Sequence, residues 1–173
     1  MDLVLQFPEA EIGYWASVYL GVWTLRDRQR EERLIELADK IQRHGEMTSE
    51  ELIDVQRWKS WRKIKLIEEH TDSKIRSITR DAFDATDDWK KISLLTDLSG
   101  MGVPRASVVL HLYDKKPFPM ADKFAKKSIG FSGSYTERFW RSYCEFTRSI
   151  AKRNGFSMRT LDRALWAWGW YHS

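Results

Sequence analysis

Two glycines, Gly100 and Gly102, lie in the segment LSGMG and are followed directly by the apolar stretch VPRASVVLHLY. Glycine permits tight turns and lets the backbone approach a ligand without a side chain in the way. A helix that begins directly after such a turn directs free N–H groups and the positive end of its dipole outward, which favours phosphate binding. Most glycine turns between helices bind nothing, so the pattern also fits an ordinary tight turn.

A basic segment that contains tryptophans precedes the glycine turn. Residues 57–65 read RWKSWRKIK, with five positive charges and no acidic residue. Lysine and arginine contact phosphates and aromatic rings stack on bases, so this composition suits a nucleic-acid surface. The candidates for DNA contact are Arg57, Lys59, Arg62 and Lys63, and the candidates for a base pocket are Trp58 and Trp61. Tryptophans also pack in helical cores, and basic clusters are also typical of solvated helix faces.

The composition limits the class of protein. The 173 residues are 42% hydrophobic and 31% charged, which suits a single globular domain over residues 1–173. The single cysteine, Cys144, excludes a disulfide framework, a cysteine-built zinc site and a four-cysteine iron–sulfur cluster. No apolar run reaches the ~18–20 residues of a membrane span. We therefore expect a cytoplasmic protein without membrane contact, associated with the nucleoid if the source is prokaryotic. The net charge of +4 is compatible with a polyanionic partner.

The elements that must position these residues are helices. Apolar residues recur at helical spacing along nearly the whole chain, and no segment shows convincing strand alternation. Leu34, Leu37, Ala38 and Ile41 indicate one helix that Gly45 closes, and Thr48 with Glu51 forms a capping-box pattern. The glycine turn then joins two helices over about residues 87–113, with Pro104 in the first turn of the second helix. We predict an all-α globule.

The segment LSGMGVPRASVVL resembles the helix-hairpin-helix of the DNA glycosylase superfamily that includes endonuclease III. The family pattern of a leucine, two spaced glycines and a following aliphatic helix is matched by Leu98, Ser99, Gly100, Met101, Gly102, Ala106, Val108, Val109 and Leu110. Downstream, Pro119-Met120-Ala121-Asp122 is similar to the family's loop that leads to an aspartate at the start of a helix. Upstream, residues 58–62 are similar to its aromatic and basic positions. The resemblance covers about residues 57–127.

This resemblance implies a chemistry for Asp122. The matching aspartate of the family stabilises the positive charge that develops on the sugar as the glycosidic bond breaks, or helps to activate water. Aspartate is also a favoured N-cap residue, so a capping role stays open. Bifunctional members of the family carry a nucleophilic lysine where this chain has Pro104, so the implied activity is monofunctional base excision without lyase activity.

The resemblance also implies the ligands of the hairpin. DNA contacts fall on Leu98, Gly100, Met101, Gly102 and Arg105. The backbone carbonyls of Thr96, Leu98 and Met101 would hold a monovalent cation, Na⁺ or K⁺; no other cofactor is expected. The expected architecture is two helical lobes with a cleft, Asp122 at its edge and the hairpin beside it.

Two functions from different classes remain open at this point. The first is a monofunctional DNA glycosylase that acts on a damaged or modified base. The second is a non-catalytic DNA-binding module that has kept the hairpin. A third possibility is a protein-interaction module in which the hairpin is only a turn. For the first two functions the expected partner is double-stranded DNA, bound by a monomer.

Overall fold

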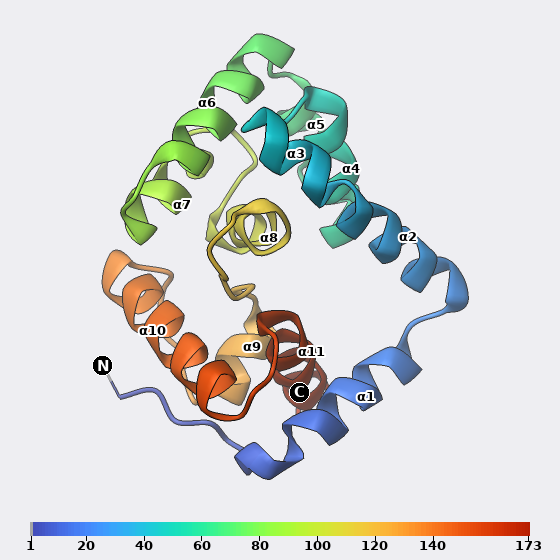
Figure 1. Cartoon of the computed structure of the whole chain (residues 1–173), viewed down its shortest axis with the longest axis vertical. Coiled ribbons are helices and arrows are strands. Elements are labelled where there is room, and N and C mark those ends of the chain that lie inside the picture. The colour runs from blue at the N-terminus through green and yellow to red at the C-terminus, as the bar shows by residue number, and fades with distance from the viewer. Residues whose placement is uncertain (1) are drawn as a thin grey trace. The chain divides into compact units, whose positions relative to one another are not determined.

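The computed structural model describes residues 2–173, and every regular element in that range is helical, as predicted. The elements are η1 (Glu9–Glu11), α1 (Ile12–Val22), α2 (Leu25–Glu36), α3 (Ala38–His44), α4 (Ser49–Lys59), α5 (Ile64–Glu68), α6 (Asp72–Asp84), α7 (Asp88–Thr96), α8 (Val103–Tyr113), α9 (Lys123–Ser128), α10 (Glu137–Arg153) and α11 (Met158–Tyr171) (Figure 1). Within residues 2–173 no helix combines the length and the apolar character that a bilayer crossing requires.

The chain divides into two compact units. The first contains the residues up to Arg28 together with Pro117–Ser173, and so holds α1, α9, α10 and α11. The second is the continuous segment Gln29–Lys116, which holds α3–α8 and most of α2. The glycine turn and the basic segment 57–65 lie in the second unit, whereas Asp122 lies in the first.

Helix starts follow the capping residues that the sequence indicates. The Thr48 hydroxyl accepts the Glu51 N–H and the Glu51 carboxylate accepts the Thr48 N–H, which completes the predicted capping box of α4. Gly45 ends α3 in the left-handed conformation with φ +69°, where glycine has no steric penalty. Pro104 lies in the first turn of α8, as predicted. Local side-chain chemistry therefore fixes these boundaries.

One helix boundary differs from the prediction. The single helix predicted across Leu34–Ile41 is interrupted at Leu37, so that α2 ends at Glu36 and α3 begins at Ala38. Leu34 and Ile41 are both buried, which means that the apolar spacing continues across the interruption and does not reveal it.

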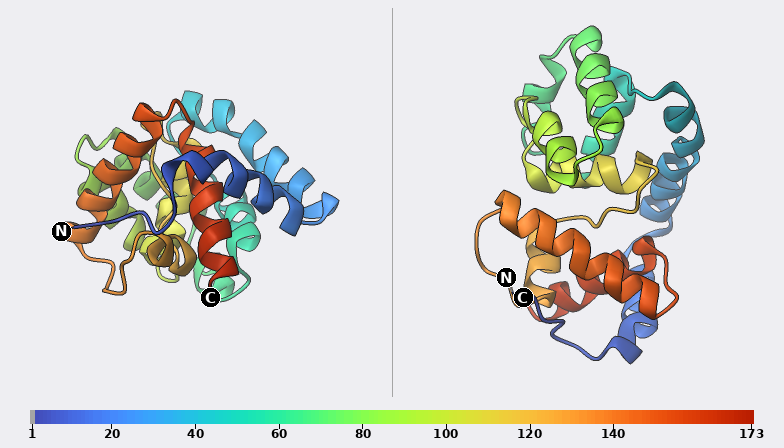
Figure 2. Two further views of the ribbon diagram at one scale, coloured as in Figure 1. Left: turned by 90° about the horizontal axis from the view of Figure 1, so that it is seen from below. Right: turned by 60° about the vertical axis from the view of Figure 1, so that its left-hand side comes forward.

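In the first unit, both α1 and α9 pack against α11 (Figure 2). Aromatic rings pack on α11: Phe7, which precedes η1, stacks on Trp168 at 5.8 Å between ring centroids, and Phe124 of α9 meets Trp166 edge-on at 5.4 Å. Cys144 is buried in α10.

In the second unit, α8 is the central helix, and its residues from Ala106 to Leu110 are fully buried. It contacts α3, α4 and α7. A buried ion pair closes its carboxyl end: Lys91 Nζ lies 2.7 Å from Asp114 Oδ2, and both side chains are almost completely enclosed. Because removing charges from water is costly, the two groups are stable there only as a pair. The carboxyl end of α8 is therefore held in place, and the glycine turn lies directly before its first residue.

Candidate nucleic-acid interface

The turn between α7 and α8 is short and firmly anchored. The Met101 N–H donates to the Leu98 carbonyl at 2.9 Å, and both side chains are buried, with exposed fractions of 4% and 1%. Thr96, the last residue of α7, uses its hydroxyl to bond the Ser93 carbonyl at 2.7 Å. The turn therefore rests on apolar side chains below, while Ser99 and Gly102 are exposed.

The two glycines of the turn have different roles. Gly100 adopts φ +89°, and a Cβ there would lie 3.0 Å from Ile67 Cγ1 and 3.1 Å from both Leu66 Cβ and the Lys63 carbonyl oxygen. Gly100 is therefore required for close packing against α5. Gly102 has an ordinary φ of −90°, and only Pro104 Cδ, at 3.8 Å, would meet a Cβ on it. Of the two, Gly102 is the one whose exposed side remains open for a ligand.

The structure brings the basic segment next to this turn. The close approach of Gly100 to the Lys63 carbonyl places the start of α5 directly against the hairpin. A second link lies nearby, where His70 Nε2 is 3.3 Å from the Ser99 carbonyl oxygen across a separation of 29 residues. The two segments that the sequence singles out separately thus form one continuous surface. We call the turns 60–63 and 97–102 the hairpin surface.

The basic side chains of residues 57–63 differ in exposure and in ion pairing. Arg62 and Lys63 are exposed in the turn between α4 and α5, where Lys63 adopts φ +60°. Arg57 pairs with Glu68 at 2.7 Å, with both side chains about one-third exposed. Lys59 is half-buried at the end of α4. Arg62 and Lys63 are consequently the charges best placed to meet a phosphate.

Arg105 faces inward rather than toward a ligand. Its side chain is buried, Nη1 donates to Gln56 Oε1 at 3.2 Å, and Nη2 donates to the Ser60 carbonyl at 3.0 Å. Burial lowers the pKa of this guanidinium from its usual value. These bonds tie α8 to α4 and fix the turn that carries Arg62 and Lys63. In this structure Arg105 holds the hairpin surface in place instead of forming part of it.

The two tryptophans of the basic segment are not equivalent. Trp61 is 67% exposed, and the Arg57 guanidinium lies 5.7 Å from its ring centroid. Trp58 is half-buried on α4. Of these two rings, Trp61 is the one presented to solvent at the edge of the hairpin surface. The sequence gives them similar neighbours, and only the fold separates them.

Asp122 is the N-cap residue of α9. Its Oδ1 accepts the N–H groups of Phe124 at 2.9 Å and Ala125 at 3.0 Å, and the side chain is half-buried. Burial first, and then the charge of Asp122, raises the pKa of Tyr135 to about 12. The aspartate therefore begins a helix, as the resemblance implies, and its carboxylate performs the capping role that the sequence left open.

Within residues 2–173, no group of three or more histidine, cysteine, aspartate or glutamate side chains is arranged so that it could hold a metal ion. The cation expected at the hairpin would instead bind backbone oxygens. The Leu98 carbonyl already accepts the Met101 N–H, and a carbonyl oxygen has a second lone pair that can meet a cation. The donor chemistry of this turn is thus compatible with Na⁺ or K⁺, which prefer oxygen ligands.

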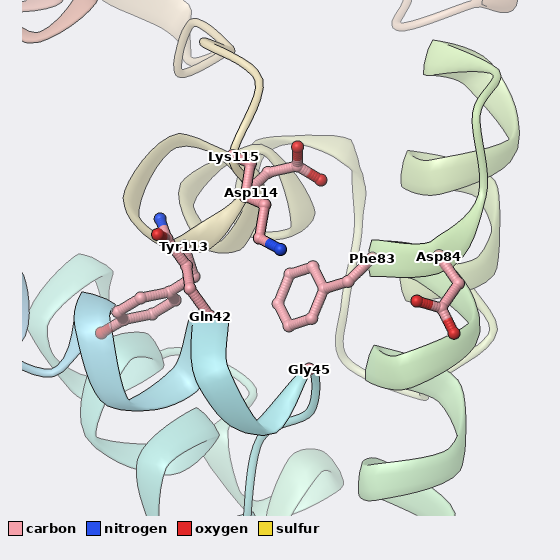
Figure 3. Close-up of a pocket in the computed structure, with 7 residues that line it drawn as sticks. All are labelled: Gln42, Gly45, Phe83, Asp84, Tyr113, Asp114 and Lys115. Atoms are coloured by element: carbon pink, nitrogen blue, oxygen red, sulfur yellow. The ribbon is translucent and has the colours of Figure 1, made fainter.

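A small cavity that the sequence did not indicate lies among the carboxyl ends of α3, α6 and α8 (Figure 3). Its volume is about 100 Å³, and it is lined by Gln42, Gly45, Phe83, Asp84, Tyr113, Asp114 and Lys115. The Phe83 ring points into it, whereas the Tyr113 hydroxyl points away and donates to the Leu34 carbonyl at 3.1 Å. Small-molecule sites usually measure ~300–1,000 Å³. We therefore assign this cavity no ligand.

Neither family models, nor curated proteins, nor solved structures give a match to this chain.

Proposed function

We propose that this protein binds double-stranded DNA through the hairpin surface. The observation that carries the proposal is the contact of Gly100 with Lys63, which joins the glycine turn and the basic turn into one surface. Arg62 and Lys63 supply positive charge there, and the exposed Gly102 leaves the start of α8 accessible to a phosphate. Within this proposal, a monovalent cation held by the carbonyls of Thr96, Leu98 and Met101 would offset phosphate charge.

Salt dependence of binding provides the test. Arg62→Gln with Lys63→Gln should weaken the binding of a 20-base-pair duplex, measured by fluorescence anisotropy. The slope of log affinity against log salt is negative, and its magnitude, which we call the salt slope, should decrease by about one unit for each lost phosphate contact. The matched control is Arg43→Gln with Lys115→Gln, which removes two exposed charges of the same unit beyond the other end of α8.

The outcomes separate local contact from overall charge. A slope lowered by about two units in the first variant and nearly unchanged in the control supports the hairpin surface. An equal effect in both variants would mean that only net charge matters, and the proposal would fail. Absence of duplex binding by the unaltered protein at low salt would also reject it.

Excision of a base with the help of Asp122 is the second candidate function. The observation that favours it is the partial burial of this carboxylate close enough to Tyr135 to raise the pKa of that phenol. A fixed negative charge in such surroundings can stabilise an oxocarbenium-like transition state. The capping bonds to Phe124 and Ala125 account for Asp122 without catalysis, so DNA binding alone is our first proposal.

A panel of duplexes that carry different lesions, treated with alkali after incubation, would reveal excision. Asp122→Asn is the informative variant, because asparagine caps helices as well as aspartate and removes only the charge. If the protein excises a base, this variant should lose two to four orders of magnitude in rate and keep its duplex affinity. Full activity in Asp122→Asn would leave the residue with its capping role alone.

A further inference from the structure

The short helix α9 carries three lysines on one side. Lys126 and Lys127 follow Lys123 by three and four residues, a spacing that places all three side chains on one face of a helix. The opposite face contains the buried residues Ala125 and Ser128. α9 is therefore an amphipathic turn of helix whose outward face is basic.

α9 is held rigidly by its neighbours. A Cβ on Gly169 would lie only 2.1 Å from the Phe124 carbonyl oxygen, so α9 and α11 pack at backbone distance. The N-terminal segment braces its other end, because the N–H of Gln6 donates to the Ser128 carbonyl at 2.9 Å and that of Val4 to the Ile129 carbonyl at 3.3 Å. The three lysines thus project from a fixed platform.

The lysines surround a shallow depression of about 350 Å³ that Gly130, Phe131 and Ser132 complete, and no carboxylate is among its lining residues. Lys126 Nζ lies 5.2 Å from the Phe131 ring centroid and 4.6 Å from that of Tyr135. Its stem is half-buried, and burial lowers its pKa. Lys127 donates to the His172 carbonyl, which restrains the ammonium group without neutralising it.

We propose that this basic depression of α9 binds the backbone phosphates of DNA and forms a contact separate from the hairpin surface. The inference rests on the proposed function, since it assigns a second contact for the same ligand. Charge complementarity carries it: three lysines border a hollow that no carboxylate lines, and two of their ammonium groups, those of Lys126 and Lys127, are restrained by backbone carbonyls. Lysine acts here as a point charge, which suits contact with phosphates rather than recognition of bases.

The test removes the three charges in the full-length protein. Lys123→Gln, Lys126→Gln and Lys127→Gln together should lower the salt slope of duplex binding by about two to three units, because each phosphate contact contributes about 0.9. The matched control is Arg26→Gln, Arg138→Gln and Lys152→Gln, three exposed positions of the same unit, which should change the slope by less than one unit. Circular dichroism establishes that both variants are folded.

A second readout does not depend on substitution. Acylation of lysines by an amine-reactive reagent, located by mass spectrometry, should show the three α9 lysines protected when the unaltered protein binds duplex. Normal duplex binding with an unchanged slope in the α9 variant and no protection would overturn this inference and leave the hairpin proposal standing. Binding to phosphatidylserine vesicles that is tighter than binding to duplex would assign the depression to a membrane surface instead, provided that the α9 variant loses vesicle binding and keeps the salt slope of duplex binding. Failure of the unaltered protein to bind duplex rejects both proposals.

Discussion

Arg105 shows how a side chain of DNA-binding type serves the fold when its neighbours are buried. The guanidinium donates hydrogen bonds to Gln56 Oε1 and the Ser60 carbonyl, and so it holds the turn between α4 and α5. Glu9 has a comparable role in the first unit, where Arg153 and Asn154 bond its carboxylate and connect the N-terminal segment to the end of α10.

We expect Arg105→Ala to destabilise the protein by about 2–3 kcal/mol, because hydrogen bonds to charged groups are strong and their loss leaves Gln56 Oε1 and the Ser60 carbonyl without their donor. Urea unfolding followed by circular dichroism measures the change. The control Arg62→Ala, at an exposed position, should change stability by at most about 0.5 kcal/mol and instead reduce the salt slope of DNA binding. The reverse pattern would assign ligand contact to Arg105.

The bonds of Glu9 predict a specific dependence on pH. Hydrogen bonds from Arg153, and then from Asn154, lower the pKa of Glu9 from 4.5 to about 2. A carboxyl group whose pKa is lower in the folded state stabilises the protein above pH 4.5, and this contribution is lost as the pH falls toward 2. Glu9→Gln should therefore be less stable than the unaltered protein at pH 7, by up to about 1 kcal/mol for a pair open to solvent, and equally stable at pH 2.

Urea unfolding of both proteins at pH 7, 4 and 2 tests this dependence. A stability difference that stays constant across this range would show that the ion pair contributes nothing through titration of Glu9.

At the residue scale, the sequence indicates which side-chain types could contact DNA but does not show which of them are exposed. Trp58 and Trp61 have similar neighbours in the chain, yet one is half-buried and the other projects into solvent. Arg105 follows the glycine turn as a DNA-contacting residue would, and its burial depends on Gln56 and Ser60, which lie 45 or more residues earlier. Such contacts depend on tertiary packing, which spacing alone does not encode.

At the scale of elements, the sequence predicted those helix boundaries that depend on local backbone chemistry. The capping box at Thr48, the end of α3 at Gly45 and the start of α8 around Pro104 follow from backbone preferences that act within a few residues. The contact of the hairpin with α5 could not be predicted, because it requires a close approach at Gly100 between segments that are distant in sequence. The sequence therefore suggested Gly100 as a position for ligand contact, whereas the structure shows that it packs against α5.

This difference predicts that substitution by alanine destabilises the fold more at Gly100 than at Gly102. Gly100→Ala should destabilise the fold by roughly 1–2 kcal/mol or more, because alanine is disfavoured at φ +89° and its Cβ would press on Ile67 and Leu66. Gly102→Ala should cost only about 0.5 kcal/mol, since alanine is a poorer N-cap residue than glycine but the φ of this position is ordinary and its surroundings are open.

Thermal unfolding and duplex affinity, measured on both variants, separate folding from binding. If the hairpin contacts phosphate as proposed, Gly102→Val should weaken duplex binding in a protein of nearly unaltered stability. Unchanged affinity in a folded Gly102→Val variant would remove the start of α8 from the proposed DNA surface.

At the scale of the whole molecule, the two units differ in how many segments of the chain they contain. The second unit is one continuous segment, and its core surrounds the central helix α8. The first unit needs both ends of the chain, because α1 packs along α11 and Phe7 stacks on Trp168. Helical periodicity predicted an all-α protein, but it carries no information about which helices share a core.

The continuity of the second unit predicts that it folds alone. A fragment of residues 25–116, which keeps α2 whole, should show helical circular dichroism and a cooperative urea transition. A fragment of residues 117–173 lacks α1 and should not unfold cooperatively, because the apolar face of α11 that α1 covers would be exposed. The 25–116 fragment contains the hairpin surface but not α9. It should therefore still bind duplex DNA, with a salt slope about two to three units lower than that of the full chain. A folded 25–116 fragment without duplex affinity would place the main DNA contact outside the hairpin surface, and a fragment with the full slope would leave no contribution for the lysines of α9.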